Sequence, residues 1–273
     1  MSAGEAVATS AIGGRLWFYT NYHCNLACRY CLTESKPDAQ RRELEVATIL
    51  RAADDAVALG FTAFGVTGGE PFLEPLMPNL LTELGRRLPT VVLTNGTLFT
   101  PRLLDALAPL ANLPVALQIS LDDADPFVND AQRGGGNFAK VVAAIPVLRA
   151  HGLGVRIGST VDGTTPEALE RLCELHRSLG IADVDHVVRP IVRRGRAAEH
   201  GLGIAVERED LPAELTLTAQ GAYWSPAAPT VQGGVLDIDY LLTRTLLPLA
   251  IPVAAMLRVA TTQPLAEPAL RVT

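Results

Sequence analysis

The segment Cys24-Asn25-Leu26-Ala27-Cys28-Arg29-Tyr30-Cys31 places three thiols close together, with the spacing C-x3-C-x2-C. A [4Fe–4S] cluster held only by protein takes four cysteine thiolates, so three would leave one iron open to a ligand that is not protein. Zinc is the alternative, but it favours paired C-x2-C units with two further Cys or His. Only Cys28 and Cys31 form such a pair, and His23 directly precedes Cys24, a poor position for a fourth ligand on the same metal. The segment alone leaves both metals open.

The whole chain has the composition of a globular protein. Its 273 residues are 48% hydrophobic and 5% aromatic, enough for one large α/β domain or a domain with an extension. The formal net charge of −6 argues against broad nucleic-acid binding, which relies on Lys and Arg. We therefore expect no nucleic-acid partner.

Targeting signals are not evident in the sequence. Residues 1–13 carry no basic residue and no apolar run like that of a secretory signal, so we expect a flexible lead-in. The apolar stretch 245–257 contains two prolines and is shorter than the roughly 20 residues that span a bilayer. Three clustered cysteines out of four do not suggest a disulfide framework. These features predict a cytoplasmic protein without a membrane partner.

Strand-like and helix-like segments alternate six times along the chain. The predicted strands are residues 16–20, 61–67, 90–93, 115–120, 154–161 and 184–190, and the predicted helices between them are 44–59, 76–88, 101–107, 138–151 and 167–179. This order predicts a parallel sheet covered by helices, either as an open doubly wound sheet or as a barrel. A dinucleotide-binding sheet would need G-x-G-x-x-G after the first strand, where the cysteine segment lies instead. We therefore favour an α/β fold of the partial (β/α)6 TIM-like barrel type.

The unusual residues follow the ends of successive predicted strands. In parallel α/β folds functional groups gather at these carboxyl ends. Gly68 and Gly69 permit close backbone approach, and Glu70 is able to accept from an ammonium group, as an amino acid chelating an open iron would require. A simple strand-to-helix turn is the alternative for this motif. The full set is Cys24, Cys28, Cys31, Gly68, Gly69, Glu70, Thr94, Asn95, Ser120, Asp122, Ser159, Arg189 and Pro190.

Taken together, three motifs resemble the radical S-adenosylmethionine superfamily over residues 14–196. They are the cysteine segment with Tyr30 before its last cysteine, Gly68-Gly69-Glu70-Pro71, and Ser120-Leu121-Asp122. The resemblance implies an enzyme with one [4Fe–4S] cluster on Cys24, Cys28 and Cys31, and S-adenosylmethionine on the fourth iron. Reductive cleavage would give a 5′-deoxyadenosyl radical that abstracts hydrogen from a peptide or a small metabolite. A reducing partner such as a flavodoxin or ferredoxin is implied as well.

The same resemblance implies contacts to S-adenosylmethionine. Residues 68–70 would contact the methionine amine and Arg133 its carboxylate. The ribose or the substrate would face Ser120, Asp122, Asn95 and Ser159, and the adenine would lie against the backbone near Val188 and Arg189. Asp122 is also a common turn residue, and Arg133 an ordinary loop cation.

The resemblance weakens after residue 196. Relatives of the peptide-modifying SPASM/twitch group carry a cysteine-rich C-terminal domain, whereas this chain has no cysteine after Cys173. We expect residues 197–273 to form a short α+β extension without cluster ligands. Cys173 lies on an apolar helical stripe, which favours a core position over a catalytic one.

Further candidates for substrate contacts lie in and after the sixth strand. Arg193, Arg194 and Arg196, with Arg189, form a basic cluster suited to a carboxylate, a phosphate or an acidic peptide, or else a solvated turn. Tyr223 and Trp224 would either close over the barrel mouth or anchor the extension to the core. The sequence names neither the substrate nor the reaction.

Two other functions compete with the radical enzyme. One is a non-catalytic iron–sulfur or zinc protein, such as a sensor, on the same barrel. The other is a relative of the molybdopterin-precursor cyclases, which carry a C-terminal cysteine triplet that this chain lacks.

Overall fold

Six parallel strands form the core of the fold. The structure is a computed structural model, and it describes residues 2–262. The last part of the expected extension, residues 263–273, lies outside the described residues. The strands are β1 (Arg15–Tyr19), β2 (Ala63–Thr67), β3 (Thr90–Thr94), β4 (Val115–Ser120), β5 (Gly154–Val161), β6 (His186–Pro190), β7 (Thr216–Thr218), β8 (Gly221–Tyr223), β9 (Thr230–Gln232), β10 (Val235–Asp237) and β11 (Leu241–Thr243).

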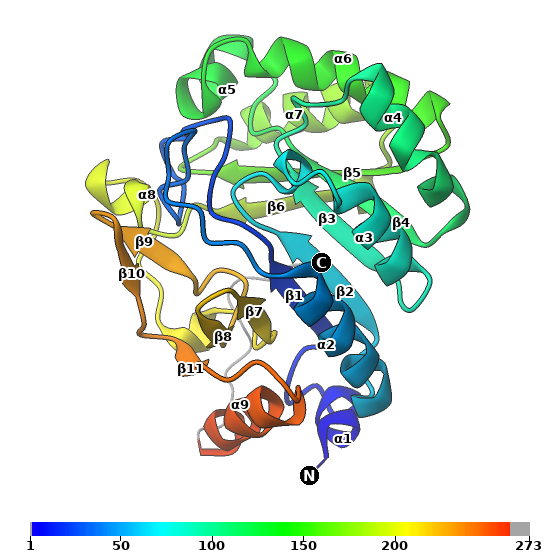
Figure 1. Cartoon of the computed structure of the whole chain (residues 1–273). Coiled ribbons are helices and arrows are strands. Elements are labelled where there is room, and N and C mark those ends of the chain that lie inside the picture. The colour runs from blue at the N-terminus through cyan, green and yellow to red at the C-terminus, as the bar shows by residue number, and fades with distance from the viewer. Residues whose placement is uncertain (1, 263–273) are drawn as a thin grey trace.

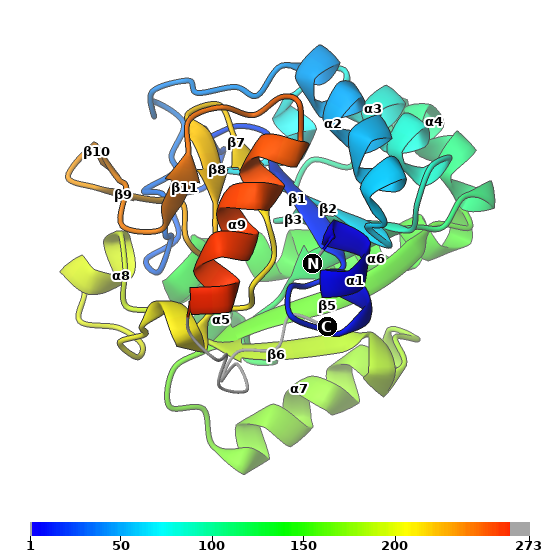
Figure 2. The same cartoon turned by 90° about the horizontal axis from the view of Figure 1, so that it is seen from below.

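Helices α2, α3, α4, α6 and α7 cover the outer face of this curved sheet (Figures 1 and 2). The α-helices are α1 (Ala3–Ala8), α2 (Val46–Leu59), α3 (Met77–Gly85), α4 (Pro101–Leu107), α5 (Pro126–Arg133), α6 (Asn137–Ala150), α7 (Pro166–Ser178), α8 (Arg196–Glu199) and α9 (Ala250–Thr262). Four short 3-10 helices complete the described part: η1 (Pro71–Leu73), η2 (Ala108–Asn112), η3 (Asp183–Asp185) and η4 (Arg208–Asp210).

Local sequence signals explain where several helices begin and end. Helices α4 and α7 each begin with proline after a threonine N-cap, whose hydroxyl accepts a backbone N–H: Thr100 from Leu103 and Thr165 from Ala168. Helix α2 ends at Gly60, which has a φ of 88°, a conformation that glycine adopts without steric cost. The predicted strand–helix alternation is therefore confirmed, with boundaries shifted by a few residues.

The sheet is not closed into a barrel within residues 2–262. Its order is β11-β8-β7-β1-β2-β3-β4-β5-β6, and β6 forms one edge. On the other side, β7 pairs in parallel with β1, and β8 and β11 follow antiparallel. The open parallel arrangement confirms the α/β partial-barrel prediction. Strands β7, β8 and β11 of the extension continue the core sheet, whereas β9 and β10 form a separate two-stranded sheet.

Two regions differ from the sequence prediction. Residues 126–133, expected as a polar loop, form α5, because Asp125 caps the helix at Phe127 N–H and Pro126 occupies its first turn. The expected flexible lead-in contains α1, with Ala3, Ala6 and Ile12 buried. Helix α1 contacts α9 at the lower end of the molecule in Figure 1.

Hydropathy of the helices bears on membrane association. Within residues 2–262, none is both long and apolar enough to cross a membrane.

Candidate cluster and cofactor site

A cavity of about 240 Å³ lies at the carboxyl ends of the core strands. Most of the residues singled out in the sequence line it: Cys24, Cys28, Tyr30, Cys31, Gly68, Gly69, Thr94, Asn95, Ser120, Arg133, Arg189 and Pro190. They come from the ends of β1, β2, β3, β4 and β6 and from α5. Residues far apart in the sequence thus share one site, as the strand-end argument predicts.

Two of the three cysteines lie beside hydrogen-bond donors. Cys24 Sγ accepts from Leu26 N–H at 3.3 Å and lies 3.6 Å from Asn95 Nδ2, and Cys31 Sγ accepts from Ser35 N–H at 3.3 Å. Burial raises the pKa of the Cys24 thiol to about 12 and also raises that of Cys28. Because metal ligation requires thiolates, a bound cation would have to supply the charge that keeps these sulfurs deprotonated.

Gly68 and Gly69 are required by the chain that follows β1. A Cβ on Gly68 would meet Asn21 Oδ1 at 2.3 Å, and one on Gly69 would meet His23 O at 2.1 Å. Backbone hydrogen bonds from Gly69 N to Asn21 O and from Glu70 N to His23 O join the two segments. The glycines therefore allow the Gly-Gly-Glu segment to pack against the start of the cysteine segment while both line the cavity.

Glu70 lies behind the cavity wall rather than on it. Its buried carboxylate accepts from Phe72 N–H at 3.0 Å, Thr94 Oγ1 at 2.9 Å and Asn95 N–H at 2.8 Å. Burial raises the pKa of Glu70, and these three hydrogen bonds oppose that shift. The carboxylate thereby fixes the end of β2 to the end of β3, a role that the sequence analysis does not anticipate.

Arg133 is held by a buried ion pair. Its Nη1 lies 3.1 Å from Asp122 Oδ2, both side chains are about 5% exposed, and Tyr30 OH donates to the same carboxylate oxygen at 2.5 Å. Asp122 Oδ1 accepts from Thr160 N–H at 2.9 Å. Asp122 does not line the cavity. It positions Arg133, whose guanidinium also contacts Tyr30 OH.

Two cofactor candidates lie away from the cavity. Ser159 Oγ donates to Leu121 O at 2.5 Å and contacts His186 Nε2 at 2.9 Å, because the alternation of side chains along β5 directs it to the opposite face of the sheet from the cavity. Val188 is 39% exposed and does not line the cavity. Arg189 beside it does, and burial lowers the pKa of its guanidinium.

The arginines after β6 contact protein groups instead of the cavity. Arg193 donates to Gly203 O, and Arg194 pairs with Asp237 and lies over the ring of Tyr240. Arg196 Nη1 donates to Cys28 O at 2.6 Å, and its Nη2 to Ser35 O at 3.0 Å. Arg196 therefore clamps the cysteine segment.

The aromatic pair of the extension is buried. Tyr223 and Trp224 are 0% and 1% exposed, and neither lines the cavity. Tyr223 OH donates to Asp237 O at 3.3 Å, and the backbone N–H of Trp224 donates to Tyr240 O at 3.1 Å. They anchor the extension, which was one of the two roles considered for them.

A family model supports the similarity suggested by the motifs. It describes the radical SAM superfamily and matches residues 19–176, more than half of the chain. The chain belongs to the radical SAM superfamily.

Peptide-modifying members of this superfamily are among its relatives. The chain is 31% identical over 165 residues to the antilisterial bacteriocin subtilosin biosynthesis protein AlbA of Bacillus subtilis, covering 60% of this chain and 36% of AlbA. It is 33% identical over 163 residues to the PqqA peptide cyclase of Ruegeria pomeroyi, covering 58% of this chain and 42% of the cyclase. The chain thus spans less than half of the length of these relatives.

Solved radical SAM structures share the fold. Streptococcus suis SuiB bound to S-adenosylmethionine matches with a TM-score of 0.57 at 19% identity, covering 66% of this chain and 41% of SuiB. SuiB has also been solved bound to its precursor peptide SuiA. At this identity the likeness establishes the fold.

The radical SAM cavity contains wall residues that the sequence analysis missed. Thr33 and Ser35 line it, and their hydroxyls form a chain with Tyr19 OH through contacts of 2.9 and 2.8 Å. Pro226 and Ala227 of the extension line it as well. Proximity of Thr33 and Ser35 to Cys31 was the only available signal, and nothing local marks the two extension residues.

The donor set fits the cofactors that the superfamily uses. Three thiols line the cavity with backbone and amide N–H groups directed at two of the sulfurs, as expected around a cysteine-bound iron–sulfur cluster. Arg133, Gly68 and Gly69 line the same space. These groups suit a zwitterionic ligand with one carboxylate and one amine.

Proposed function

We propose that this chain is a radical S-adenosylmethionine enzyme that acts on a peptide. The observation that carries the proposal is the lining of one cavity by all three cysteines, both glycines and Arg133. The similarity to AlbA and the PqqA peptide cyclase supports a peptide substrate, and the similarity to a GTP 3′,8-cyclase of Rhodopseudomonas palustris keeps a small metabolite as the second candidate. The non-catalytic alternative is not favoured, because these relatives are enzymes.

Cys24, Cys28 and Cys31 would hold one [4Fe–4S] cluster, with S-adenosylmethionine bound beside it. When bound and reduced, this pair supplies a 5′-deoxyadenosyl radical that removes a substrate hydrogen atom. A flavodoxin or ferredoxin is the reductant that we propose. Within the described residues no cysteine other than these three lines the cavity, which supports a single cluster there.

The other cavity residues would orient S-adenosylmethionine and exclude water. Gly68 and Gly69 would face the methionine amine, and Arg133 would pair with the methionine carboxylate through the planar fork of its guanidinium. Asp122 and Tyr30 keep this guanidinium in place. Ser120 and Asn95 would hydrogen-bond to the ribose or the substrate.

Apolar residues close the remaining walls. Leu32, Ile191 and Val192 line the cavity together with Pro226 and Ala227 of the extension. An apolar wall excludes water, which strengthens the polar contacts inside the cavity and protects a reactive radical from side reactions. Arg189 is the second guanidinium in this space, and we assign it to a carboxylate of S-adenosylmethionine or of the substrate.

Anaerobic reconstitution with iron and sulfide tests the proposed function. With dithionite and S-adenosylmethionine, the reconstituted chain should release methionine and 5′-deoxyadenosine, measured by liquid chromatography with mass detection. Adding the correct peptide should increase 5′-deoxyadenosine formation, and a deuterated peptide should transfer deuterium into it.

A pair of cysteine variants supplies the matched control. Cys28→Ala should lose iron and 5′-deoxyadenosine together, whereas Cys173→Ala should retain both, because Cys173 does not line the cavity. A fully iron-loaded wild-type chain that forms no 5′-deoxyadenosine would disprove the proposal.

A further inference from the structure

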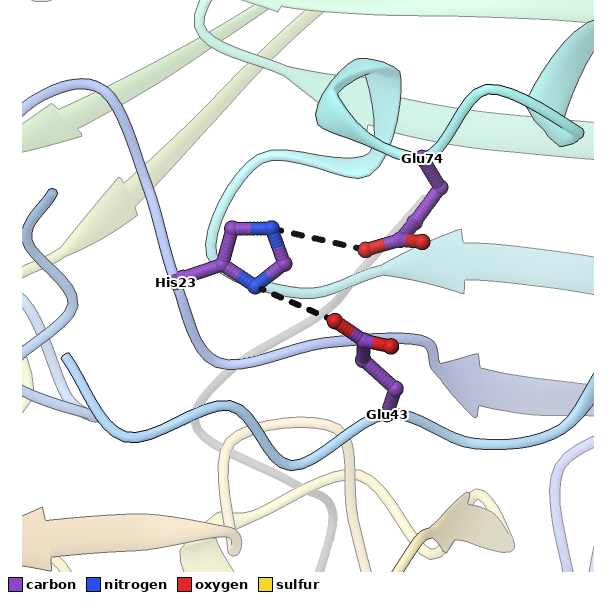
Figure 3. Close-up of side chains that lie close together, drawn as sticks. All are labelled: His23, Glu43 and Glu74. Carbon is purple, nitrogen blue, oxygen red and sulfur yellow. Dashed lines mark ion pairs between the residues drawn. The ribbon is translucent and has the colours of Figure 1, made fainter. Parts of the chain in front are cut away.

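A second group of potential metal ligands lies outside the cavity, where His23, Glu43 and Glu74 converge (Figure 3). One ligand atom from each residue lies within 4.8 Å of the other two. The three residues come from the position before Cys24, from the segment before α2 and from the end of η1. None of them lines the cavity described above. The trio therefore needs its own explanation.

The spacing of the trio resembles that of ligands around an ion. His23 Nε2 lies 3.4 Å from Glu74 Oε1, and His23 Nδ1 lies 3.9 Å from Glu43 Oε1. Charge-assisted hydrogen bonds are shorter, about 2.7–2.9 Å. Two ligands that each lie about 2.1 Å from a tetrahedral ion are separated by about 3.4 Å. The distance from His23 Nε2 to Glu74 Oε1 matches this separation. Glu43 faces the other ring nitrogen, Nδ1, and its half-exposed side chain has room to turn toward the Nε2 side.

Two atoms of the trio are buried without a hydrogen-bond partner among the described residues. His23 is only 5% exposed, and both its Nδ1 and Glu74 Oε1 lack such a partner. Figure 3 shows both carboxylates directed toward the imidazole. Because buried polar atoms are nearly always satisfied, orphaned atoms beside both nitrogens of one imidazole indicate missing partners.

The local charge also favours a cation. Glu43 and Glu74 contribute two negative charges, and Arg41 pairs with Glu43 at 3.1 Å from an exposed position. One negative charge beside the buried imidazole is left over. A divalent ion between His23 Nε2 and Glu74 would more than offset this charge and supply a partner for Glu74 Oε1.

We propose that His23, Glu43 and Glu74 bind a divalent transition-metal ion through one imidazole and two carboxylates. Zn²⁺ and Mn²⁺ both accept this donor set. The ion would join the residue that precedes Cys24 to the turn that follows Glu70. It would thereby brace the cysteine segment from outside the cavity, and this role does not depend on the proposed radical chemistry.

Zinc titration of a chain without the loop thiols tests the site. In the full chain carrying Cys24→Ser, Cys28→Ser and Cys31→Ser, calorimetry should detect one Zn²⁺ bound per chain. His23→Gln or Glu74→Gln should each weaken binding by more than the roughly 10- to 100-fold that loss of an outer-sphere partner costs. His200→Gln, at an exposed position, is the matched control and should leave the affinity unchanged.

A second measurement covers the case in which the triple variant does not fold, as judged by far-UV circular dichroism. Mn²⁺ binding to the cluster-loaded wild-type chain is then followed by electron paramagnetic resonance, because Mn²⁺ prefers oxygen and nitrogen to thiolate ligands. Stoichiometric binding that Glu74→Gln removes and His200→Gln does not would support the site. Failure to bind, or binding that both His23→Gln and Glu74→Gln leave intact, would overturn it and leave a histidine ion-paired with two carboxylates.

Discussion

The two sides of the strand-end rim differ in how they use their polar residues. After β1 to β4, the cysteines, Gly68, Gly69 and Ser120 line the cavity. After β5 and β6, Ser159, Arg193 and Arg196 contact other parts of the protein instead. The candidate cofactor ligands are thus concentrated on the first side, and the named residues of the second side hold protein segments together. Thr160 on β5 and Arg189 on β6 are exceptions, since both line the cavity.

The difference shows how a support residue is mistaken for a binding residue. Arg196 has the charge that recognises an anion, yet its donors are used by Cys28 O and Ser35 O. Gly195 allows this contact, because a Cβ there would meet Leu32 O at 2.2 Å. Within the basic cluster at the end of β6, Arg196 is therefore the residue that clamps the cysteine segment, whereas Arg193 and Arg194 contact Gly203 and Asp237. Variants on the two sides should therefore differ in their effects on stability, iron retention and cofactor binding.

The largest effect on folding should come from Asp122→Ala on the cavity side. It would leave the Arg133 guanidinium buried without its counterion, which costs about 3–5 kcal/mol. Asp183→Ala breaks the exposed pair with Arg177 and should cost no more than about 1 kcal/mol. Denaturant unfolding compares the two variants. Equal losses would mean that the Asp122–Arg133 pair is not buried as described.

The clamp is tested by Arg196→Ala beside Arg193→Ala. Loss of two charge-assisted hydrogen bonds, each worth about 1.5–3 kcal/mol, should loosen the cysteine segment and speed iron loss to a chelator about tenfold or more. Arg193→Ala should stay within about twofold of wild type, because it contacts only Gly203 O. If Arg196 instead recognises the substrate, KM will rise while the rate of iron loss stays constant.

A smaller, pH-dependent effect belongs to the buried His176 behind the second side. Burial, and to a smaller extent the charge of the nearby His186, lower its pKa to about 3. An unfolded imidazole titrates near pH 6.5, so between about pH 6.5 and 3 the unfolded chain binds more protons. Stability should therefore be highest above pH 6.5 and fall with acidification, by up to about 1.4 kcal/mol per pH unit from this group.

Unfolding measured from pH 7 to 5 checks this slope. His176→Phe should flatten it, and His200→Gln, at an exposed site, should not. An unchanged slope in His176→Phe would contradict the lowered pKa.

The smallest effect should distinguish two serines. Ser120→Ala, in the cavity wall, should weaken S-adenosylmethionine binding by about 2- to 10-fold, as expected for one neutral hydrogen bond. Ser159→Ala should leave the affinity within about twofold, because its hydroxyl faces Leu121 O and His186. Equilibrium binding to the reconstituted chain compares them. A greater loss from Ser159→Ala would place that residue in the site.

The sequence was sufficient for the features that depend on short-range patterns. Apolar runs, helix caps and Gly60 locate the core elements, and the strand-end rule brings Cys24 and Gly68 to one cavity. It was insufficient where a contact joins distant segments. The contact of Arg196 with Cys28 O spans 168 positions, and no local pattern encodes it. The sequence was also insufficient for the side-chain direction on β5. Ser159 and the next residue, Thr160, point to opposite faces of the sheet, and only Thr160 lines the cavity.

The central claim is that Cys24, Cys28 and Cys31 hold a cluster with one iron open to S-adenosylmethionine. The most direct test is electron paramagnetic resonance of the reduced, reconstituted chain before and after S-adenosylmethionine is added. We predict about four irons per chain, a [4Fe–4S]⁺ signal that S-adenosylmethionine alters, and loss of both in Cys24→Ser. A cluster signal that S-adenosylmethionine leaves unchanged, or iron retained without Cys24, would contradict the claim.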